Sequence, residues 1–150
     1  LEGGTVVFGV GFTQSGNSMS IYFQEADPHW ALMLQYDLYV CDIQYDVAVS
    51  IFWNDIDELG TNIVQTIQTN SSPMTTQADL CGSSTTDGLI PIYGAIYKKS
   101  TQNNRITWTS DISTPSGSIG IAKVNYYKAL CDNSCASCKG SGNTGCKVCN

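Results

Sequence analysis

Alternation of apolar and polar side chains dominates this chain. The longest run covers residues 30 to 40, and a second run covers residues 45 to 53. A period of two places successive side chains on opposite faces, so both runs predict β-strands and not helices. We expect these strands to form the centre of the core, joined by a tight turn near Asp42 to Gln44. Their apolar faces carry Trp30, Leu32, Leu34, Tyr36, Leu38, Val40, Tyr45, Val47, Val49, Ile51 and Trp53.

Shorter alternating segments fill much of the remaining chain. Pro91 lacks a donor for a strand ladder and indicates a sheet edge or a bulge. Ile63, Val64 and Ile67 fit either a short helix or a strand, and the sequence leaves both open. With about eight strands and no strong helix, the prediction is an all-β fold, an antiparallel β-sandwich that is jelly-roll-like. The further strands are expected at residues 5–12, 18–24, 89–97, 106–108 and 119–127.

The N-terminal segment has one apolar face and one nearly bare face, which carries Gly9 and Gly11. A strand of this kind lies flat against a sheet edge, and the Gly3-Gly4 hinge would let it leave its own domain. We therefore expect it to be a candidate assembly strand that adds to the edge of a neighbouring molecule. The alternative is that it pairs within its own sandwich. The residues proposed for assembly are Val6, Val7, Phe8, Val10 and Phe12.

Composition narrows the possible partners. Hydrophobic residues make up 42% of the 150 residues, but charged residues only 13%, and the net charge is −6. Phosphate backbones and anionic membranes attract basic surfaces, so nucleic acid is not expected as a partner. No apolar run is long enough to span a membrane. The chain begins with Leu1 and lacks a basic and apolar leader, so we expect any signal peptide to have been removed.

The last twenty residues are rich in cysteine and poor in apolar side chains, with only Ala136 and Val148 between the thiols. Such a segment cannot offset its ordering entropy by burial, so crosslinks must hold it. Two Cys-x-x-Cys pairs resemble half-sites of a zinc centre, although only seven residues separate them. The low charge and Ser/Thr-rich composition favour disulfides in a secreted protein. The cysteines of this segment are Cys131, Cys135, Cys138, Cys146 and Cys149.

This cysteine spacing, with Gly140 at the expected glycine, resembles the furin-like repeat of growth-factor receptors. Such repeats occur in large surface proteins of ciliates and other protists, where they often follow a β-domain. The segment Gly120–Tyr127 is similar to the last strand of such a domain, so the resemblance covers roughly residues 105 to 149. It implies an extracellular or cell-surface location, a β-sandwich domain over residues 1–130 and a cysteine-rich segment over residues 131–150. It does not imply an activity.

The same resemblance implies that Cys131 pairs with Cys138 and Cys135 with Cys146. Cys149 is then free, bonded to another chain, or paired beyond residue 150. Separately, we expect Cys41 to bond with Cys81 and to pin the long polar loop between residues 69 and 87. A disulfide across such a loop reduces the conformational entropy of the unfolded chain and thereby stabilises the folded state.

Catalytic constellations are hard to find in the sequence. His29 is the one histidine, and a position in a turn before a strand explains it better than a triad does. Asp55 and Asp57 resemble the start of a calcium loop, but later ligand positions lack oxygen side chains, so an acidic turn is favoured and no metal is expected. Glycosidase carboxylates drawn from Asp37, Asp42, Asp46 or Asp55 rank low, because no spacing selects a pair.

Two further features point to an extracellular protein. Asn70-Ser71-Ser72 is an N-glycosylation sequon in a segment that we expect to be exposed. We expect the tryptophans, including Trp108, to lie in the core, whereas exposed tyrosines offer a platform for sugars. The tyrosines considered are Tyr22, Tyr39, Tyr93, Tyr97, Tyr126 and Tyr127.

These observations favour a non-enzymatic, extracellular structural protein without a cofactor. Its expected role is that of a subunit of a surface coat or filament, with other copies of itself as partners and head-to-tail contacts between β-domains. The alternative is a secreted carbohydrate-binding, lectin-like module, for which the partners are glycans.

Overall fold

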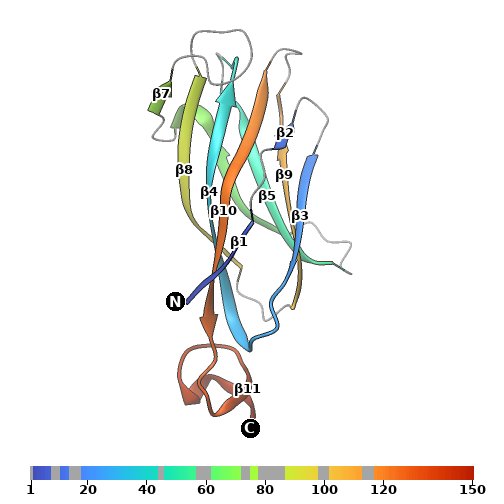
Figure 1. Cartoon of the computed structure of the whole chain (residues 1–150), viewed down its shortest axis with the longest axis vertical. Coiled ribbons are helices and arrows are strands. Elements are labelled where there is room, and N and C mark those ends of the chain that lie inside the picture. Colours follow the sequence, from blue (N-terminus) through green and yellow to red (C-terminus); the bar gives the residue numbers. More distant parts are fainter. Residues whose placement is uncertain are drawn as a thin grey trace.

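The computed structural model is an all-β chain with a small tail at one end of the main body (Figure 1). It describes residues 2–7, 11–13, 18–43, 46–56, 62–71, 75–77, 87–97, 102–112 and 117–150. The strands are β1 Glu2–Val7, β2 Gly11–Thr13, β3 Ser18–Gln24, β4 His29–Cys41, β5 Ala48–Asp55, β6 Ile63–Gln68, β7 Thr75–Gln77, β8 Asp87–Tyr97, β9 Asn103–Ser110, β10 Ser118–Leu130, β11 Cys135–Cys138 and β12 Cys146–Cys149. Two short 3-10 turns cover Thr69–Ser71 and Asn143–Gly145.

Two antiparallel sheets form a sandwich. Sheet A has the order β1-β10-β4-β8-β7, and β2 also pairs with β10. Sheet B has the order β3-β9-β5-β6. The chain passes repeatedly from one sheet to the other, so strands close in sequence often lie in opposite layers. This is the strand order of a jelly roll, as the alternating pattern predicted.

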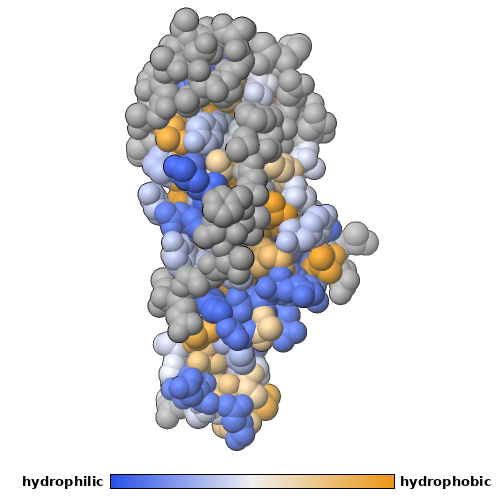
Figure 2. All heavy atoms as spheres, in the orientation of Figure 1, coloured by the Kyte–Doolittle hydropathy of each residue, from blue (hydrophilic) through white to orange (hydrophobic). Residues whose placement is uncertain are grey.

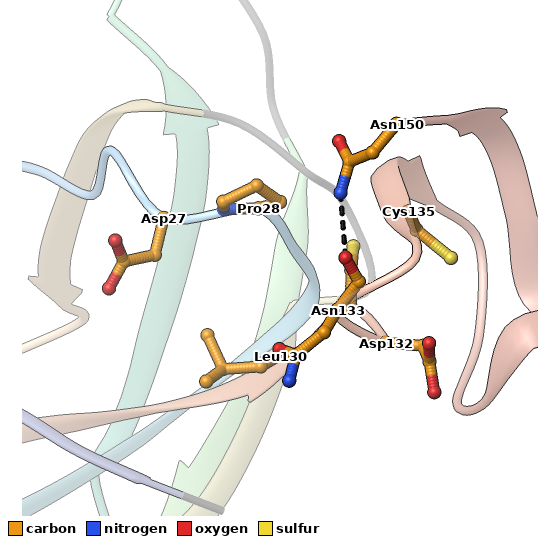
Figure 3. Close-up of a pocket in the computed structure, with 8 residues that line it drawn as sticks. Asp27, Pro28, Leu130, Asp132, Asn133, Cys135 and Asn150 are labelled. Carbon is orange, nitrogen blue, oxygen red and sulfur yellow. Dashed lines mark hydrogen bonds between the residues drawn. The ribbon is translucent and has the colours of Figure 1, made fainter.

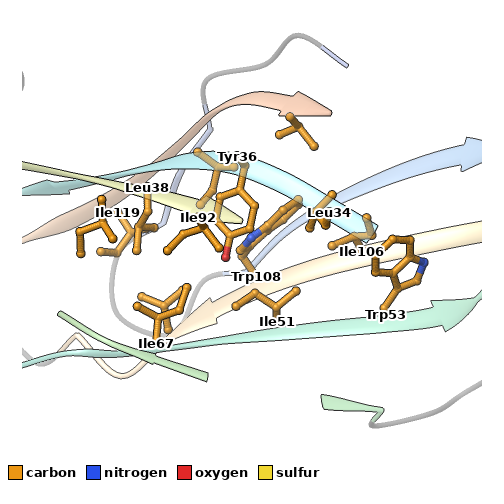
Figure 4. Close-up of a cluster of buried hydrophobic side chains, with 14 of the residues drawn as sticks. Leu34, Tyr36, Leu38, Ile51, Trp53, Ile67, Ile92, Ile106, Trp108 and Ile119 are labelled. Carbon is orange, nitrogen blue, oxygen red and sulfur yellow. The ribbon is translucent and has the colours of Figure 1, made fainter. Parts of the chain in front are cut away.

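The core lies between the facing sides of the two sheets (Figure 4). Leu34, Tyr36 and Leu38 of β4 point toward Ile51 of β5 and Trp108 of β9. All of them are at most 1% exposed. Burial of a side chain of this size contributes about 1.5 to 3 kcal/mol, so this layer is the main source of stability. The aromatic rings of Tyr36 and Trp108 meet edge to face with centroids 5.5 Å apart.

The two central strands lie in different sheets, and the tight turn expected near Asp42 to Gln44 falls partly outside the described residues. β4 pairs with β10 and β8, whereas β5 pairs with β9 and β6. The two strands therefore face each other across the core instead of sharing a ladder. The alternation identified the buried faces correctly, but a period of two does not specify which strand lies beside which. Asp42, with a φ of 54°, lies where the chain leaves β4.

Several smaller expectations are settled by the structure. Ile63 to Gln68 form a strand, β6, and not a helix. Within the segment at residues 5–12, the described residues belong to strands β1 and β2, and residues 8–10 lie outside the described part of the chain. Pro91 lies beyond the short β7 ladder, which ends at Leu89, and therefore borders an edge of sheet A among the described strands. Trp53 and Trp108 are core residues, but Trp30 is only half-buried, because it lies near an irregularity of register at the end of the sandwich.

The tail is a small unit of its own, in which β11 and β12 form a two-stranded sheet. Disulfides join Cys131 to Cys138 and Cys135 to Cys146, with Cα–Cα distances of 5.6 and 5.3 Å. These are the pairs that the furin-like resemblance implies, and they engage three of the four thiols of the two Cys-x-x-Cys pairs, which a zinc site would need. The described residues contain no helix that is long and apolar enough to cross a membrane.

Candidate binding face on the outer side of sheet A

The outer side of sheet A brings together polar and aromatic side chains from three neighbouring strands. In one row Gln35 of β4 lies opposite Tyr93 of β8 and Asn125 of β10. In the adjacent rows, Asp37 and Tyr39 continue the outward side of β4. Lys123 projects from β10 beside Asp37. We call the six residues Gln35, Asp37, Tyr39, Tyr93, Lys123 and Asn125 the binding face.

Both strands that flank β4 are irregular at the level of the binding face. β10 has an extra residue between Ala122 and Asn125, and Lys123 there adopts a φ of 52°. β8 has an extra residue next to Tyr93, where Gly94 has a φ of 91°. Bulges locally twist a strand and redirect its side chains, and they are frequent beside functional sites. Two bulges at the same height, one on each side of β4, therefore distinguish this face.

An ion pair lies in the middle of the binding face. Lys123 Nζ is 3.2 Å from Asp37 Oδ2. The Lys123 side chain is 72% exposed, whereas that of Asp37 is only 18% exposed. The hydrogen bond with Asp37, and the charge of that carboxylate, raise the pKa of the Lys123 ammonium above its ordinary value. Tyr39 and Tyr93 contribute smaller effects in the same direction. Lys123 is therefore cationic at neutral pH, with Asp37 as its counterion.

Tyr93 is the most exposed of the large aromatic side chains described, at 67%. A ring in that position offers an apolar surface next to the donors and acceptors of the ion pair. The amides of Gln35 and Asn125 add further donors and acceptors in the same row as Tyr93. The face can therefore bind a ligand that has both apolar C–H surface and many hydroxyl groups.

The tyrosines singled out from the sequence fall into three groups. Tyr97 and Tyr126 are core residues with 4% exposure, so their expected role as exposed platforms is wrong. Tyr39 and Tyr127 are half-buried. Tyr22 and Tyr93 are exposed, but Tyr22 lies on sheet B opposite Arg105. Alternation divides the side chains of a strand between its two faces, but tyrosine occurs on both the buried and the exposed face. The sequence therefore could not separate the buried tyrosines from the exposed ones.

A second polar cluster lies at the end of the sandwich nearest the tail. Glu25 Oε2 accepts a hydrogen bond from the Tyr126 hydroxyl at 3.0 Å, and Glu25 Oε1 accepts one from Lys128 Nζ at 3.3 Å. Lys128 also pairs with Asp27. Glu25 is only 5% exposed, whereas the Asp27 side chain is 60% exposed, so the network extends from a buried carboxylate to the surface. The space-filling view shows hydrophilic residues gathered across the lower part of the sandwich, next to the tail (Figure 2).

The junction of sandwich and tail contains a shallow hollow of about 370 Å³ (Figure 3). Asp27 and Pro28 border it from the sandwich, and Asn133 and Asn150 from the tail. The Asn150 side chain donates to the Asn133 carbonyl at 2.6 Å, which closes one side of the hollow. The Cys131 amide donates to the Pro28 carbonyl at 3.0 Å and anchors the start of the tail. These contacts are structural, and they give the tail a defined position against the sandwich.

His29 is the first residue of β4 and is buried, with 2% exposure. Its Nδ1 lies 2.8 Å from the Asp27 carbonyl and donates to it, since a carbonyl can only accept. This matches the interpretation of a histidine in a turn that precedes a strand. Asp37, one of the carboxylates considered for glycoside hydrolysis, lies beside Lys123. Asp46, another of them, accepts a hydrogen bond from the Asn70 amide at 2.9 Å.

The proposed assembly strand is paired within its own chain. Val7 lies opposite Val124, and Phe12 lies opposite Gly120, both on β10. This is the intramolecular arrangement that the sequence left as the alternative. The backbone of Val6 also belongs to β1, whereas Phe8 and Val10 lie outside the described residues.

Two predicted sites lie partly outside the described residues. Cys41 is buried and disulfide-bonded. Cys81 is not among the described residues, so its bond with Cys41 stays a prediction. Asp57, of the possible calcium loop, also lies outside them. Asn70 of the sequon is exposed, and Cys149 is an exposed free thiol.

Comparison with known proteins supports the fold. No family model matches the sequence, and no curated protein matches it either. Among solved structures, the chain is similar to the C-terminal domain of EclA, described as a sugar-binding protein. The TM-score is 0.50 at 10% sequence identity, and the match covers 85% of this chain and 83% of that one. At this identity the likeness establishes a shared architecture.

Proposed function

We propose that this protein is an extracellular carbohydrate-binding module, without catalytic activity, whose ligand lies on the binding face of sheet A. The observation that carries the proposal is the exposed Tyr93 ring on the same face as the Asp37–Lys123 pair. A sugar ring has an apolar side that packs on an aromatic ring, and hydroxyl groups that need both donors and acceptors. The similar architecture of a sugar-binding protein supports the same assignment.

The proposed location rests on the tail and on the sequon. Disulfides persist in oxidising compartments, and this tail has no other evident means of holding its structure. Asn70 is exposed, as glycosylation requires. If the protein is secreted from a eukaryotic cell, amidase removal of N-glycans should lower its mass and convert Asn70 to Asp. An unchanged peptide mass would show that the site is empty. The resemblance of the tail to furin-like repeats of protist surface proteins supports the same location.

A glycan array followed by titration calorimetry tests the proposed function. Tyr93→Ala should weaken binding of the best ligand by about tenfold or more, because an aromatic platform contributes on the order of 1 to 3 kcal/mol. Tyr22→Ala is the matched control, since it removes a comparably exposed tyrosine from the opposite sheet. If the two variants lose affinity equally, or if neither loses affinity, the assignment of the site to sheet A is contradicted. A protein that binds no glycan on the array would contradict the function itself.

Assembly is the second candidate function, and the exposed thiol of Cys149 is the observation that favours it. An exposed thiol in an oxidising compartment can bond with the same residue of another copy. In that case non-reducing electrophoresis of native protein should show a dimer that Cys149→Ser abolishes. If the native protein is a monomer on the non-reducing gel, the proposal of assembly through Cys149 is contradicted.

A further inference from the structure

We propose that the binding face selects neutral glycans over acidic ones, and that Asp37 is the residue that determines this specificity. The inference rests on the proposed function, because it names the class of sugar that the same face would bind. Its basis is the placement of one carboxylate and one ammonium at the centre of a face that is otherwise uncharged.

Charge on the binding face is balanced within the face itself. Among its six residues Asp37 and Lys123 carry the charges, and their Nζ–Oδ2 distance of 3.2 Å makes each the counterion of the other. The flanking side chains Gln35, Tyr93 and Asn125 are neutral. An anionic sugar would therefore approach Lys123 only beside the negative charge of Asp37. Like charges placed together at a site disfavour binding of the wrong partner.

The field of the whole chain acts in the same direction. Thirteen acidic residues against seven basic ones give a net charge of −6. Such a charge repels polyanions at long range, an effect that weakens as salt screens it. Polymers of uronic acids and sulfated sugars are thus disfavoured both at a distance and at the site.

The paired groups retain ample capacity for hydroxyl groups. An ammonium carries three donors and a carboxylate about four acceptor positions, and one contact between them uses only one of each. Adjacent hydroxyls of a neutral sugar can donate to Asp37 and accept from Lys123 at the same time. Hydrogen bonds to charged groups contribute more than those between neutral groups, so this pair gives orientation as well as affinity.

The partial burial of Asp37 explains why this residue, more than Lys123, sets the specificity. The Asp37 side chain is 18% exposed and is fixed within β4, between β8 and β10. Lys123 is long and 72% exposed, so its ammonium stays where it is chiefly because Asp37 attracts it. Removal of the Asp37 charge would leave an exposed ammonium without its counterion, next to an aromatic ring and two amides. A face of that kind suits a carboxylate or sulfate group.

The test compares wild type, Asp37→Asn and the double variant Asp37→Asn with Lys123→Gln on two panels of polysaccharides. One panel holds neutral glucans, galactans and mannans, and the other holds polyuronates and sulfated glycans. Wild type should bind at least one neutral polymer and no acidic one. Asp37→Asn should bind that neutral polymer about tenfold more weakly, because a charge-assisted acceptor is lost. It should gain salt-sensitive binding to acidic polymers, and the double variant should lose that gain.

Asp46→Asn is the matched control, because it changes the net charge equally at an exposed position that precedes β5, a strand of sheet B. It should leave both panels unchanged. If wild type prefers acidic polymers, the inference is wrong but the proposed function stands. The same holds if Asp37→Asn gains no binding to acidic polymers. If wild type and all variants bind neither panel, the proposed function fails and the inference fails with it.

Discussion

At the scale of single residues, Lys123 is in a conformation that most side chains avoid. Its φ of 52° lies in the left-handed region, which costs a residue with a Cβ roughly 1 to 2 kcal/mol. Glycine adopts this conformation freely, yet the chain has lysine here. Strain of this kind is retained where the side chain serves a purpose, and at Lys123 the ammonium is thereby placed beside Asp37.

Lys123→Gly should therefore separate stability from binding. The free energy of unfolding should stay unchanged or rise by up to about 1 kcal/mol, because strain is relieved while an exposed ion pair of little energetic value is lost. Glycan binding should fall, since the ammonium donor is gone. Asp42→Gly is the matched control, with a φ of 54° at the end of β4, and it should keep binding intact. Chemical denaturation and calorimetry would measure both effects. A clear loss of stability in Lys123→Gly would show that the lysine is structural.

At the scale of elements, the buried carboxylate of Glu25 links the segment that follows β3 to β10, next to the tail. Glu25→Gln should lower the free energy of unfolding by about 1 to 3 kcal/mol, because Lys128 then has a weaker buried partner. Tyr126→Phe removes one hydrogen bond from the same carboxylate and should cost about 1 kcal/mol. Urea titrations of both variants give the comparison. Equal stability of wild type and Glu25→Gln would mean that the network contributes nothing.

The same junction should depend on pH in a defined direction. The hydrogen bond with Asp27, and to a smaller extent the one with Glu25, raise the pKa of Lys128, although desolvation opposes them. A lysine whose pKa is raised by folding stabilises the protein fully below its unfolded pKa of about 10.4. That contribution is lost as the pH rises through the folded value. Between pH 9 and pH 11.5 the stability difference between wild type and Lys128→Met should therefore shrink. A constant difference over that range would contradict the assignment.

The tail should unfold on reduction while the sandwich stays folded. Loops closed by cysteines 7 and 11 residues apart each stabilise by about 2.5 to 3 kcal/mol in the chain-entropy model. Few apolar contacts replace them, since the two buried hydrophobic residues of the tail are Cys135 and Cys138. Hydrogen exchange after mild reduction should show loss of protection in residues 131–150 alone. Before reduction an alkylating reagent should label Cys149 and spare the bonded thiols. Stoichiometric zinc with several reactive thiols would contradict the disulfide pairing.

The sequence predicted the positions of the strands better than it predicted which strands pair with each other. Period-two alternation located β3, β4 and β5 and the buried side of each, because burial is what the alternation reflects. It could not show that β4 and β5 belong to opposite sheets, since alternation gives the buried face of a strand and not the strand that pairs with it. The binding face was predicted only in part. The sequence analysis named Tyr39 and Tyr93 as candidates for a sugar platform and Asp37 as a candidate carboxylate. It did not name Gln35, Lys123 or Asn125, which join them only through register.

At the scale of the whole molecule, the N-terminal strands decide between a self-contained sandwich and a subunit built to exchange strands. β1 and β2 follow the free side of β10 from Lys128 to Ile119, so they cover an edge that would otherwise lie open. An exposed edge strand attracts other chains. β1 and β2 thus cover the β10 edge of their own domain, and strand exchange would require them to give up this ladder.

Deletion of residues 1–13 distinguishes the two arrangements. The self-contained sandwich predicts that the truncated protein melts at a lower temperature and aggregates through the uncovered edge of β10, while the intact protein elutes as a monomer. Loss of the ladder removes backbone hydrogen bonds, each with a net contribution of roughly 0.5 to 1.5 kcal/mol, so the decrease in stability should be easily measured. Size-exclusion chromatography and thermal denaturation of both proteins provide the comparison, and a synthetic peptide of residues 1–13 added in trans should restore the melting temperature. The assembly hypothesis predicts the reverse pattern. The intact protein would polymerise, and the truncated one would stay folded as a monomer, because the strand would then belong to a neighbouring molecule and not to its own β10.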